Sequence, residues 1–512
     1  MPSEQNGSRQ MQKLSGLDTM FLSIDTSTTS GLVGTLFIFD RDGAPDGANR
    51  AAIRERLLDR LDAIPPLRWR LREVPPRSGL QYWDDDPEFD IDDHLNDRVL
   101  AAPGTHRQLT AEVARLMALP AEPDQPPWDL YVIEGLEGGN VAHLLRIHHA
   151  LIDGGLMADV TAILADDWKR PPSLGKPSGA SSRARPDALT QTLASAVEVP
   201  VRAVGLQTEL MAWLGKRVVQ DGIRTVPGLV TRGLRGAIGI PGRAAAGLRP
   251  APAPADGDRG GGGGGGVGLP RIVAPKTRLT GALTNRREYA FTVMSLPEVR
   301  RLGKATGSTV NDVVMSLGAA AVRRYLKELG ELPGKPLTAV VATSTRTGKE
   351  RTKWTNYVWM MLAEFPTDVE DPVRRLKAAR AAMKKAKATS NALPIGLIQS
   401  ASYFWPSALM MAGAKFMARP AIAKRIPVTP WNLTMSNVRG LSKPISIDGV
   451  QAVGNYPVTF LPPSTGLGIV VVSYGDDLEC CVATCPDLVP DAERIAGYLT
   501  DALADLSRAV GK

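Results

Sequence analysis

Hydrophobic and polar positions follow one another along the chain with spacings that predict a mixture of strands and helices. The apolar run at 31–39 indicates a buried strand, and a polar turn follows it. Two more strands are predicted at 128–135 and 141–147, on either side of a Gly-Gly-Asn turn. Apolar residues at helical spacing predict helices at 51–64, 109–117 and 155–168. Strands and helices that interleave in this way favour a mixed α/β layer over a helical bundle.

A second series of elements begins near residue 271. Its predicted strands are 287–293, 337–343, 357–365, 467–474 and 478–484, and its predicted helices are 310–329, 372–388 and 491–506. Between the two series lie a basic stretch of helical pattern, 188–248, and a Pro/Gly-rich stretch with seven consecutive glycines at 260–266, which is typical of a flexible linker. We therefore predict a first domain at 1–186, a helical connection and linker at 187–270, and a second domain at 271–512.

Composition narrows the class of protein. A chain of 512 residues exceeds the usual size of one core, so two large domains are expected. The net charge of +8 is spread too thinly to indicate nucleic acid as a partner. The three cysteines all lie within 480–485 and cannot form a disulfide framework, which favours a reducing compartment. The N-terminus lacks the apolar region of a secretory signal and no stretch is long and apolar enough to span a bilayer, so we expect a cytoplasmic protein.

The residues that carry chemistry follow the predicted strand at 141–147. They are His148, His149, Asp153 and Gly154. An imidazole is the natural general base at neutral pH, the aspartate can orient a ring or anchor the loop by an ion pair, and the glycine lets the backbone turn sharply. Neighbouring residues of a strand point to opposite faces, so the two histidines should differ in role and form a poor site for one metal ion. An isolated His-His pair is more often structural, whereas the complete pattern favours a function.

The pattern His-His-x-x-x-Asp-Gly resembles the signature of the CoA-dependent acyltransferase superfamily, which includes chloramphenicol acetyltransferase and the condensation domains of peptide synthetases. More specifically, the chain resembles the bacterial wax ester synthase/diacylglycerol acyltransferase family. Stretches similar to segments of that family are found at 14–22, 127–136, 309–314, 436–440 and 472–474. Two departures stand out: Pro127 takes the place of a leucine before Trp128, and Thr355 takes the place of a glycine before Asn356.

The resemblance implies an α/β (α+β) fold of two chloramphenicol-acetyltransferase-like domains with a channel between them. It implies that His149 is the general base, which takes the proton of an alcohol while the alcohol oxygen attacks the thioester carbonyl of acyl-CoA. His148 would support the placement of the ring, Asp153 would anchor the loop, and Gly154 would permit the turn. Acyl-CoA would be a co-substrate, diacylglycerol or a long-chain alcohol the acceptor, and neither a cofactor nor a metal is expected.

Other candidate residues have two interpretations each. Asn311 and Asp312 lie in the first turn of a predicted helix, where capping explains them as well as a place beside the channel does. Trp128 is more often a packing residue than a substrate contact. Ser436 and Asn437 are candidates for a hydrogen bond to the developing oxyanion.

Two stretches and the function itself keep alternatives open. The basic stretch 188–248 fits a cover over the domain junction or a helix bound to anionic lipid headgroups, at the inner face of a membrane or on a lipid droplet. The apolar stretch 392–417 fits core packing, an acyl channel or a lipid surface. Besides the enzyme implied by the signature, the alternatives are a lipid-surface binding protein with little activity and an acyltransferase for a more complex lipid alcohol.

Overall fold

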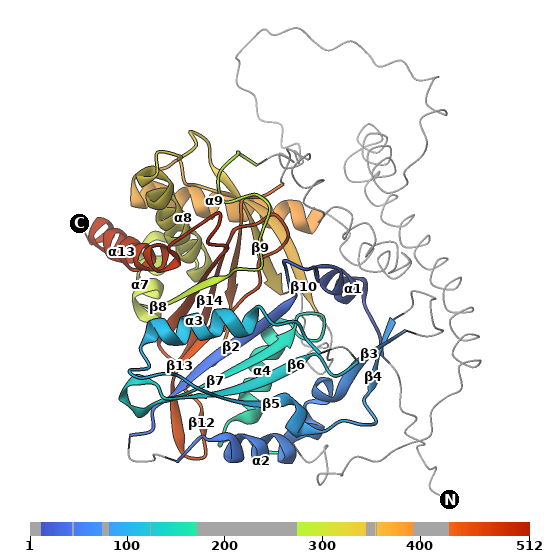
Figure 1. Ribbon diagram of the computed structural model, residues 1–512. Coiled ribbons are helices and arrows are strands. Elements are labelled where there is room, and N and C mark those ends of the chain that lie inside the picture. The colour runs from blue at the N-terminus through green and yellow to red at the C-terminus, as the bar shows by residue number, and fades with distance from the viewer. Residues whose placement is uncertain are drawn as a thin grey trace, which may run out of the picture.

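The computed structural model describes residues 12–42, 46–73, 81–122, 124–171, 274–344, 354, 356–392 and 430–511. Within them the chain forms two six-stranded mixed sheets and a small three-stranded sheet (Figure 1). The mixed α/β class predicted from the sequence is confirmed. The stretches 188–248 and 260–266 lie outside the described residues, and so does nearly all of 392–417.

The first sheet has helices on both faces. Its strands, in spatial order, are β12 (Ser446–Ile447), β13 (Val450–Val458), β2 (Leu32–Phe39), β7 (Val141–His148), β6 (Trp128–Glu134) and β5 (Leu95–Val99). Apolar side chains of α3 (His106–Met117) pack on one face, and those of α2 (Arg50–Arg60) and α4 (Gly154–Leu164) pack on the other. The predicted strands and helices of this half are confirmed, except that α4 ends before Trp168.

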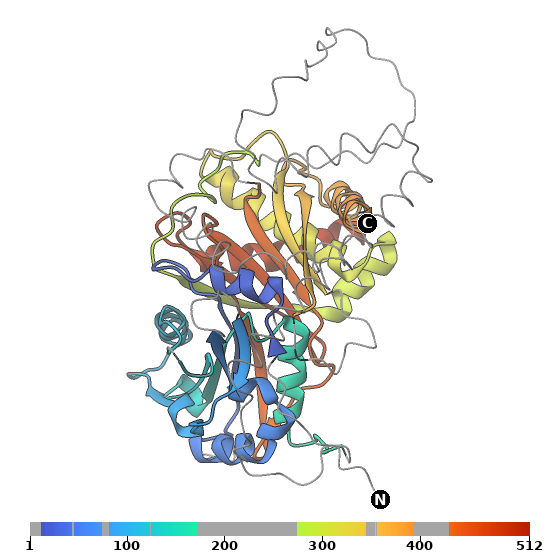
Figure 2. The same cartoon turned by 90° about the vertical axis from the view of Figure 1, so that its right-hand side faces the viewer.

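The second sheet carries its helices on one face. Its strands, in spatial order, are β10 (Val358–Phe365), β9 (Leu337–Ser344), β11 (Leu433–Val438), β14 (Leu467–Tyr474), β15 (Asp477–Thr484) and β8 (Glu288–Ser295). The helices are α7 (Leu296–Thr306), α8 (Val310–Glu328), α9 (Pro372–Ala392) and α13 (Ala492–Val510), and their apolar sides form one core with this face. The opposite face is turned toward the first half of the chain, which lies below the second in Figure 2.

Short elements complete the first half. The three-stranded sheet consists of β1 (Gln12–Lys13), β4 (Gln81–Asp85) and β3 (Trp69–Glu73), and α1 (Gly16–Ser23) follows β1. Single 3₁₀ turns occupy Leu61–Ala63, Pro65–Arg68, Ile91–His94 and Glu137–Gly139. The helix α1 begins with a capping box, in which Ser15 and Asp18 each satisfy the other's backbone amide.

The C-terminal part of the chain contributes to both sheets. The strand β13 pairs antiparallel with β2, with Tyr456 opposite Leu36, so it completes the sheet of the first half (Figure 1). The predicted division at 1–186, 187–270 and 271–512 stays a prediction, but the pairing of β13 with β2 joins its first and last parts in one sheet. No strand was predicted at 450–458, because Gly454 and Pro457 interrupt its apolar pattern. In the structure the register of this strand shifts between Ala452 and Gly454.

A buried carboxyl group lies where the two sheets meet. Glu479, on β15, is 1% exposed and accepts a hydrogen bond from the backbone amide of Asn455 on β13. The Asn455 Oδ1 atom in turn accepts one from the Thr35 hydroxyl of β2, at 2.5 Å. Burial raises the pKa of Glu479 to about 7. The contact between the two sheets therefore holds a carboxyl group whose protonated form is favoured by burial.

Replacing Glu479 with glutamine should make the protein less sensitive to alkali. Because the folded-state pKa of Glu479 lies above its unfolded value, its favourable contribution is fully present below about pH 4.5 and is lost as the pH rises through about 7. We expect the free energy of unfolding of the wild type to fall, relative to that of Glu479→Gln, by roughly 1–3 kcal/mol between pH 5 and pH 8. Denaturant titrations at both pH values measure this difference. Glu55→Gln, an exposed carboxylate of α2, should follow the wild type; parallel curves for all three proteins would contradict the assignment.

Candidate active site

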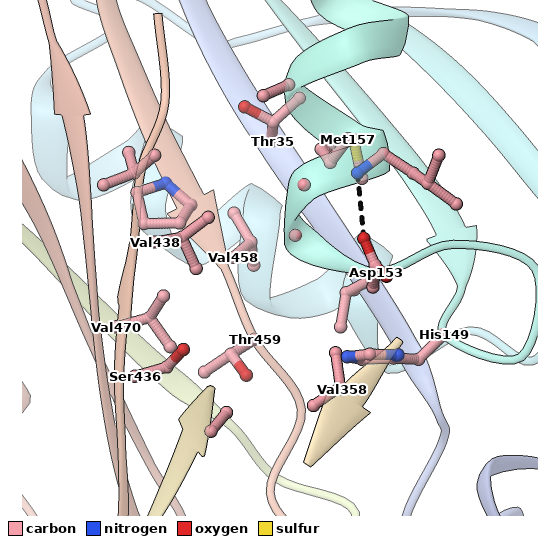
Figure 3. Close-up of a pocket in the computed structure, with 18 of the residues that line it drawn as sticks. Thr35, His149, Asp153, Met157, Val358, Ser436, Val438, Val458, Thr459 and Val470 are labelled. Atoms are coloured by element: carbon pink, nitrogen blue, oxygen red, sulfur yellow. Dashed lines mark hydrogen bonds between the residues drawn. The ribbon is translucent and has the colours of Figure 1, made fainter. Parts of the chain in front are cut away.

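A cavity of about 1180 Å³ lies between the two halves of the chain. Its walls come from β2 and α4 of the first half and from β9, β10, β11 and β14 of the second. Figure 3 shows valine side chains around it together with polar ones, with His149 and Asp153 on one side and Ser436 on the other. This is the position in which the family resemblance places a substrate channel.

His149 lies on the wall of this cavity as the first residue after β7. Its ring stacks on Phe21 of α1 at 3.9 Å between centroids and 16° between planes, and the edge of Phe460 meets it at 6.0 Å and 86°. Its backbone amide donates to the carbonyl oxygen of Gly31, at 2.9 Å. Two aromatic side chains and one backbone hydrogen bond therefore fix the ring, and its remaining exposed surface faces the cavity.

Burial keeps the His149 ring uncharged. Desolvation is the largest effect and lowers the pKa of His149 to about 4, although the Asp153 carboxylate and the Asn356 side chain act in the opposite direction. The imidazole is therefore neutral at physiological pH and is able to accept a proton.

His148 points to the opposite face of the sheet, as expected for a neighbouring strand residue. It is 2% exposed, its Nε2 atom lies 3.1 Å from Asp25 Oδ2, and its Nδ1 atom accepts the backbone amide of Ala150 at 3.1 Å. These partners assign the proton to Nε2. A Cβ atom on Gly31 would lie 2.7 Å from that nitrogen, so only glycine fits beside the ring. His148 thus holds the turn from behind, and the two histidines have different surroundings, while their predicted difference in role stays a prediction.

Asp153 joins the two halves of the chain. Its Oδ1 atom caps α4 by accepting the Leu156 amide at 2.9 Å (Figure 3), and its Oδ2 atom accepts the Tyr357 amide at 2.9 Å. Both contacts are with backbone amides, so this anchoring does not need the ion pair that the sequence suggested. The carboxylate is 2% exposed, which makes these hydrogen bonds costly to lose.

Gly154 has a different structural role from the one predicted. It is the first residue of α4, and its φ lies outside the left-handed region, so the turn does not require glycine there. Its lack of a side chain matters because a Cβ atom would lie 3.0 Å from both Cγ atoms of Val438 on β11. The expectation of a sharp glycine turn was therefore wrong; close packing between the two halves is the reason for the glycine.

The candidates from the second half lie at different distances from the cavity. Ser436 and Asn437 are on its wall. Asn311 is behind it, with its Oδ1 atom 3.5 Å from Asn437 Nδ2, and Asp312 forms a capping box with Thr309 at the start of α8. Capping thus accounts for Asp312, and the structure does not bring either residue of this pair to the cavity wall.

Trp128 is likewise away from the cavity wall. Its side chain is 1% exposed, its Nε1 atom donates to the Leu67 carbonyl oxygen at 2.7 Å, and its ring stacks on His94 at 4.5 Å. The packing interpretation of this residue therefore agrees with the structure, whereas direct substrate contact does not.

Two polar residues that the sequence analysis did not select complete the site. Asn356, 4% exposed, places its Nδ2 atom 2.7 Å from the His149 carbonyl oxygen, 3.1 Å from that of Ala150 and 2.8 Å from Asp18 Oδ1. Burial raises the pKa of Asp18 to about 6. Asp18 belongs to a stretch that resembles the family, and Asn356 follows the departure at Thr355, but nothing in their spacing indicated that they meet.

Two kinds of feature are absent from the described residues. No three side chains of His, Cys, Asp or Glu in these ranges are grouped as the ligands of a metal ion would be. No helix in the same part of the chain has the length and apolar character needed to cross a membrane.

The fold is that of CoA-dependent acyltransferases and condensation domains. The wax ester synthase/diacylglycerol acyltransferase from Marinobacter aquaeolei VT8 superimposes with a TM-score of 0.61 and 24% identity, over 98% of this chain and all of that one. The first condensation domain of the calcium-dependent antibiotic synthetase superimposes with a TM-score of 0.56 and 14% identity, over 98% and 97% of the two chains.

Sequence comparison identifies the family. The wax ester synthase/diacylglycerol acyltransferase catalytic domain matches residues 14–314, and the C-terminal domain of the same family matches residues 354–507. A predicted diacylglycerol O-acyltransferase of Mycobacterium tuberculosis is 31% identical over 97% of this chain and its own full length, and another is 28% identical over 97% and 90%. The chain belongs to the wax ester synthase/diacylglycerol acyltransferase family, and it is an acyltransferase of that family.

Replacing Asp153 with alanine should lower both stability and acyl-transfer activity. The variant loses a helix cap and leaves a buried amide without a partner, which together should cost about 2–4 kcal/mol of unfolding free energy. Thermal denaturation and turnover measure the two effects. Ser295→Ala, which removes the exposed cap of α7, should cost about 1 kcal/mol and leave turnover unchanged. Lost turnover at unchanged stability would instead give the Asp153 carboxylate a direct chemical role.

A double-mutant cycle should reveal the contact between Gly154 and Val438. Gly154→Ala should be more favourable in a Val438→Ala background than in the wild type, by about 1 kcal/mol, because the added methyl group then meets open space. Denaturant titration of the four proteins gives the coupling free energy. Additive effects would mean that the two halves do not depend on this contact.

Proposed function

We propose that this protein transfers a fatty acyl group from acyl-CoA to the hydroxyl group of diacylglycerol, of a long-chain alcohol, or of both, with His149 as the general base. The observation that carries the proposal is a neutral, aromatic-clamped imidazole facing an apolar cavity between the two halves. Triacylglycerol or wax ester would be the product, and no cofactor is needed for this chemistry.

The cavity fits lipid substrates in size and in chemistry. At about 1180 Å³ it is larger than the pockets of roughly 300–1,000 Å³ that hold drug-sized ligands. Aliphatic side chains from both halves form much of its wall, among them Val33 and Leu156 of the first half and Val340, Leu362 and Val470 of the second. Apolar walls exclude water, which protects the thioester from hydrolysis and strengthens polar interactions at the reacting atoms.

The proposed reaction is a direct transfer. The Nε2 atom of His149 takes the hydroxyl proton as the alcohol oxygen bonds to the thioester carbonyl carbon. The tetrahedral intermediate then expels the CoA thiolate, which receives the proton from His149, so that ester and free thiol leave and the imidazole is neutral again. Base catalysis of this kind contributes about 10²–10⁴-fold, and holding both substrates together contributes further.

Ser436 and Asn437 are the proposed partners of the oxyanion. Both are polar residues of β11 on the cavity wall, and each side chain is able to donate a hydrogen bond. Asn311, 3.5 Å behind Asn437, would orient its amide rather than touch substrate. Asp153 and Gly154 would hold α4, and His148 the turn, without exchanging protons.

The names of relatives support the acceptor class. The mycobacterial relatives are predicted diacylglycerol O-acyltransferases, and the Marinobacter structure is that of a wax ester synthase/diacylglycerol acyltransferase. Both acceptors are membrane-resident, so we propose that the protein works in the cytoplasm at the inner membrane face or on lipid droplets. The alternatives are a more complex lipid alcohol as acceptor, and a lipid-surface binding protein with little activity.

Acceptor assays test the proposal. Purified protein with labelled palmitoyl-CoA should produce triacylglycerol from dioleoylglycerol, wax ester from hexadecanol, or both, as separated by thin-layer chromatography. His149→Ala should abolish either product while the protein stays folded, because it removes the group proposed to take the hydroxyl proton.

His106→Ala, an exposed histidine at the start of α3, is the matched control and should keep full turnover. Turnover like the wild type in His149→Ala would contradict the base assignment. An absence of product with both acceptors, over a range of chain lengths, would favour the binding-protein alternative.

A further inference from the structure

Two buried polar atoms beside the cavity lack hydrogen-bond partners. Within the part of the chain that the structure describes, these are Nδ1 of His149 and Oδ1 of Asn356. The Nδ1 atom of His149 is able to donate a hydrogen bond when it carries a proton, and the Oδ1 atom of Asn356 is an acceptor. Buried groups of this kind are costly when unpaired, so their joint occurrence in one small site calls for an explanation.

The orientation of the Asn356 amide is unambiguous. Its Nδ2 atom lies within 3.1 Å of three acceptors, namely Asp18 Oδ1 and the carbonyl oxygens of His149 and Ala150. A carbonyl oxygen in that place would face three other oxygens, so the nitrogen must be there and Oδ1 must point the other way. The contact with Asp18 thus leaves Oδ1 as the atom of Asn356 without a partner.

The remaining Oδ1 atom is an acceptor on a side chain that contacts the histidine. Asn356 already touches the backbone of His149, and its side chain favours the protonated form of that imidazole. The carbonyl oxygen of His149 itself also acts on the ring in this sense. Asn356 is absent from the cavity wall, so it reaches the reacting atoms only through His149.

We propose that Asn356 is the positioning residue of the catalytic base: in the reacting complex its Oδ1 atom accepts a hydrogen bond from Nδ1–H of His149. This rests on the proposed function of His149. The hydrogen bond selects the tautomer that carries its proton on Nδ1, which leaves the Nε2 lone pair free for the substrate hydroxyl. When Nε2 takes that proton, the same oxygen faces the positive charge of the imidazolium.

The arrangement also makes the base depend on both halves of the chain. Asn356 precedes β10 of the second half, whereas Asp18 and His149 belong to the first. Val358, two residues after Asn356, lies on the same side of the cavity as His149 in Figure 3. Under this proposal the Nδ1 proton of the imidazole gains its partner only when the segment around residue 356 is docked against the first half.

The test follows the protons of the His149 ring directly. The protein has five histidines, so ¹⁵N-histidine labelling gives a small set of ring signals, and His149→Gln assigns the one of interest. In the wild type, ¹H–¹⁵N correlation spectra should show a neutral His149 with its proton on Nδ1. In Asn356→Ala the proton should move to Nε2 in a large part of the population.

Turnover gives a second readout. Asn356→Ala should lower kcat by about 10–100-fold through misplacement of the ring, with the KM for palmitoyl-CoA unchanged. Asn432→Ala is the matched control, since Asn432 is also buried and bonded to backbone, through Pro275 and Thr338, but in the second sheet. It should lower the melting temperature and change neither the tautomer nor kcat beyond the loss of folded protein.

The results that would contradict the role of Asn356 differ from those that would contradict the role of His149. A wild-type tautomer in Asn356→Ala would mean that the carbonyl oxygen of His149 suffices and that Asn356 is only structural. If Asn356→Ala does not fold, the wild-type spectrum still decides, because a proton on Nε2 would overturn the proposal. Retained turnover in His149→Ala would refute the base assignment alone, since the tautomer measurement does not depend on activity.

Discussion

The structure depends on keeping an uncharged imidazole at the junction of two sheets. His149 lies between Phe21 and Phe460, and burial lowers its pKa to about 4, so the ring is neutral across the physiological range. The same burial makes the ring a weaker base than free histidine, so the general-base role proposed for it would depend on positioning. The polar groups around the ring hold the backbone of this turn. His148 and Asp25 form a hydrogen bond behind it, and Asn356 donates to the carbonyl oxygen of His149.

The second half of the chain completes this site instead of merely covering it. The strand β13 extends the first sheet, the Tyr357 amide binds Asp153, and Val438 packs against Gly154. Each contact joins residues that are far apart in the sequence. The cavity between the halves is consequently bounded by elements that hydrogen bonds and close packing hold against one another.

Periodicity predicted the elements that bury a regular apolar face. The strands β2 and β7 and the helix α8 were found because uninterrupted apolar runs or helical spacing mark them. The strand β13 was missed because Gly454 and Pro457 break its pattern, and the helix α1 because it is short. Local rules thus identify elements where burial is regular and fail where pairing with a distant segment decides the structure.

The site was predictable to the extent that its residues are adjacent in the sequence. The opposite directions of His148 and His149 follow from strand geometry, and the place of Asp153 before a helix indicated an anchor. Asn356 and Asp18 are 338 residues apart, and no spacing rule relates them. Gly154 was selected for a different reason from the one that the structure shows. The sequence suggested a backbone turn, whereas the structure shows that a side chain there would crowd Val438 of the other half.

The path of β13 has a consequence for how the molecule is divided. A fragment that ended in the connection at 187–270 would lack β12 and β13, and β2 would become the border of its sheet. Its unpaired backbone groups would be a template for other strands, so such a fragment is expected to self-associate. The two halves are therefore better regarded as one unit of folding than as two independent modules.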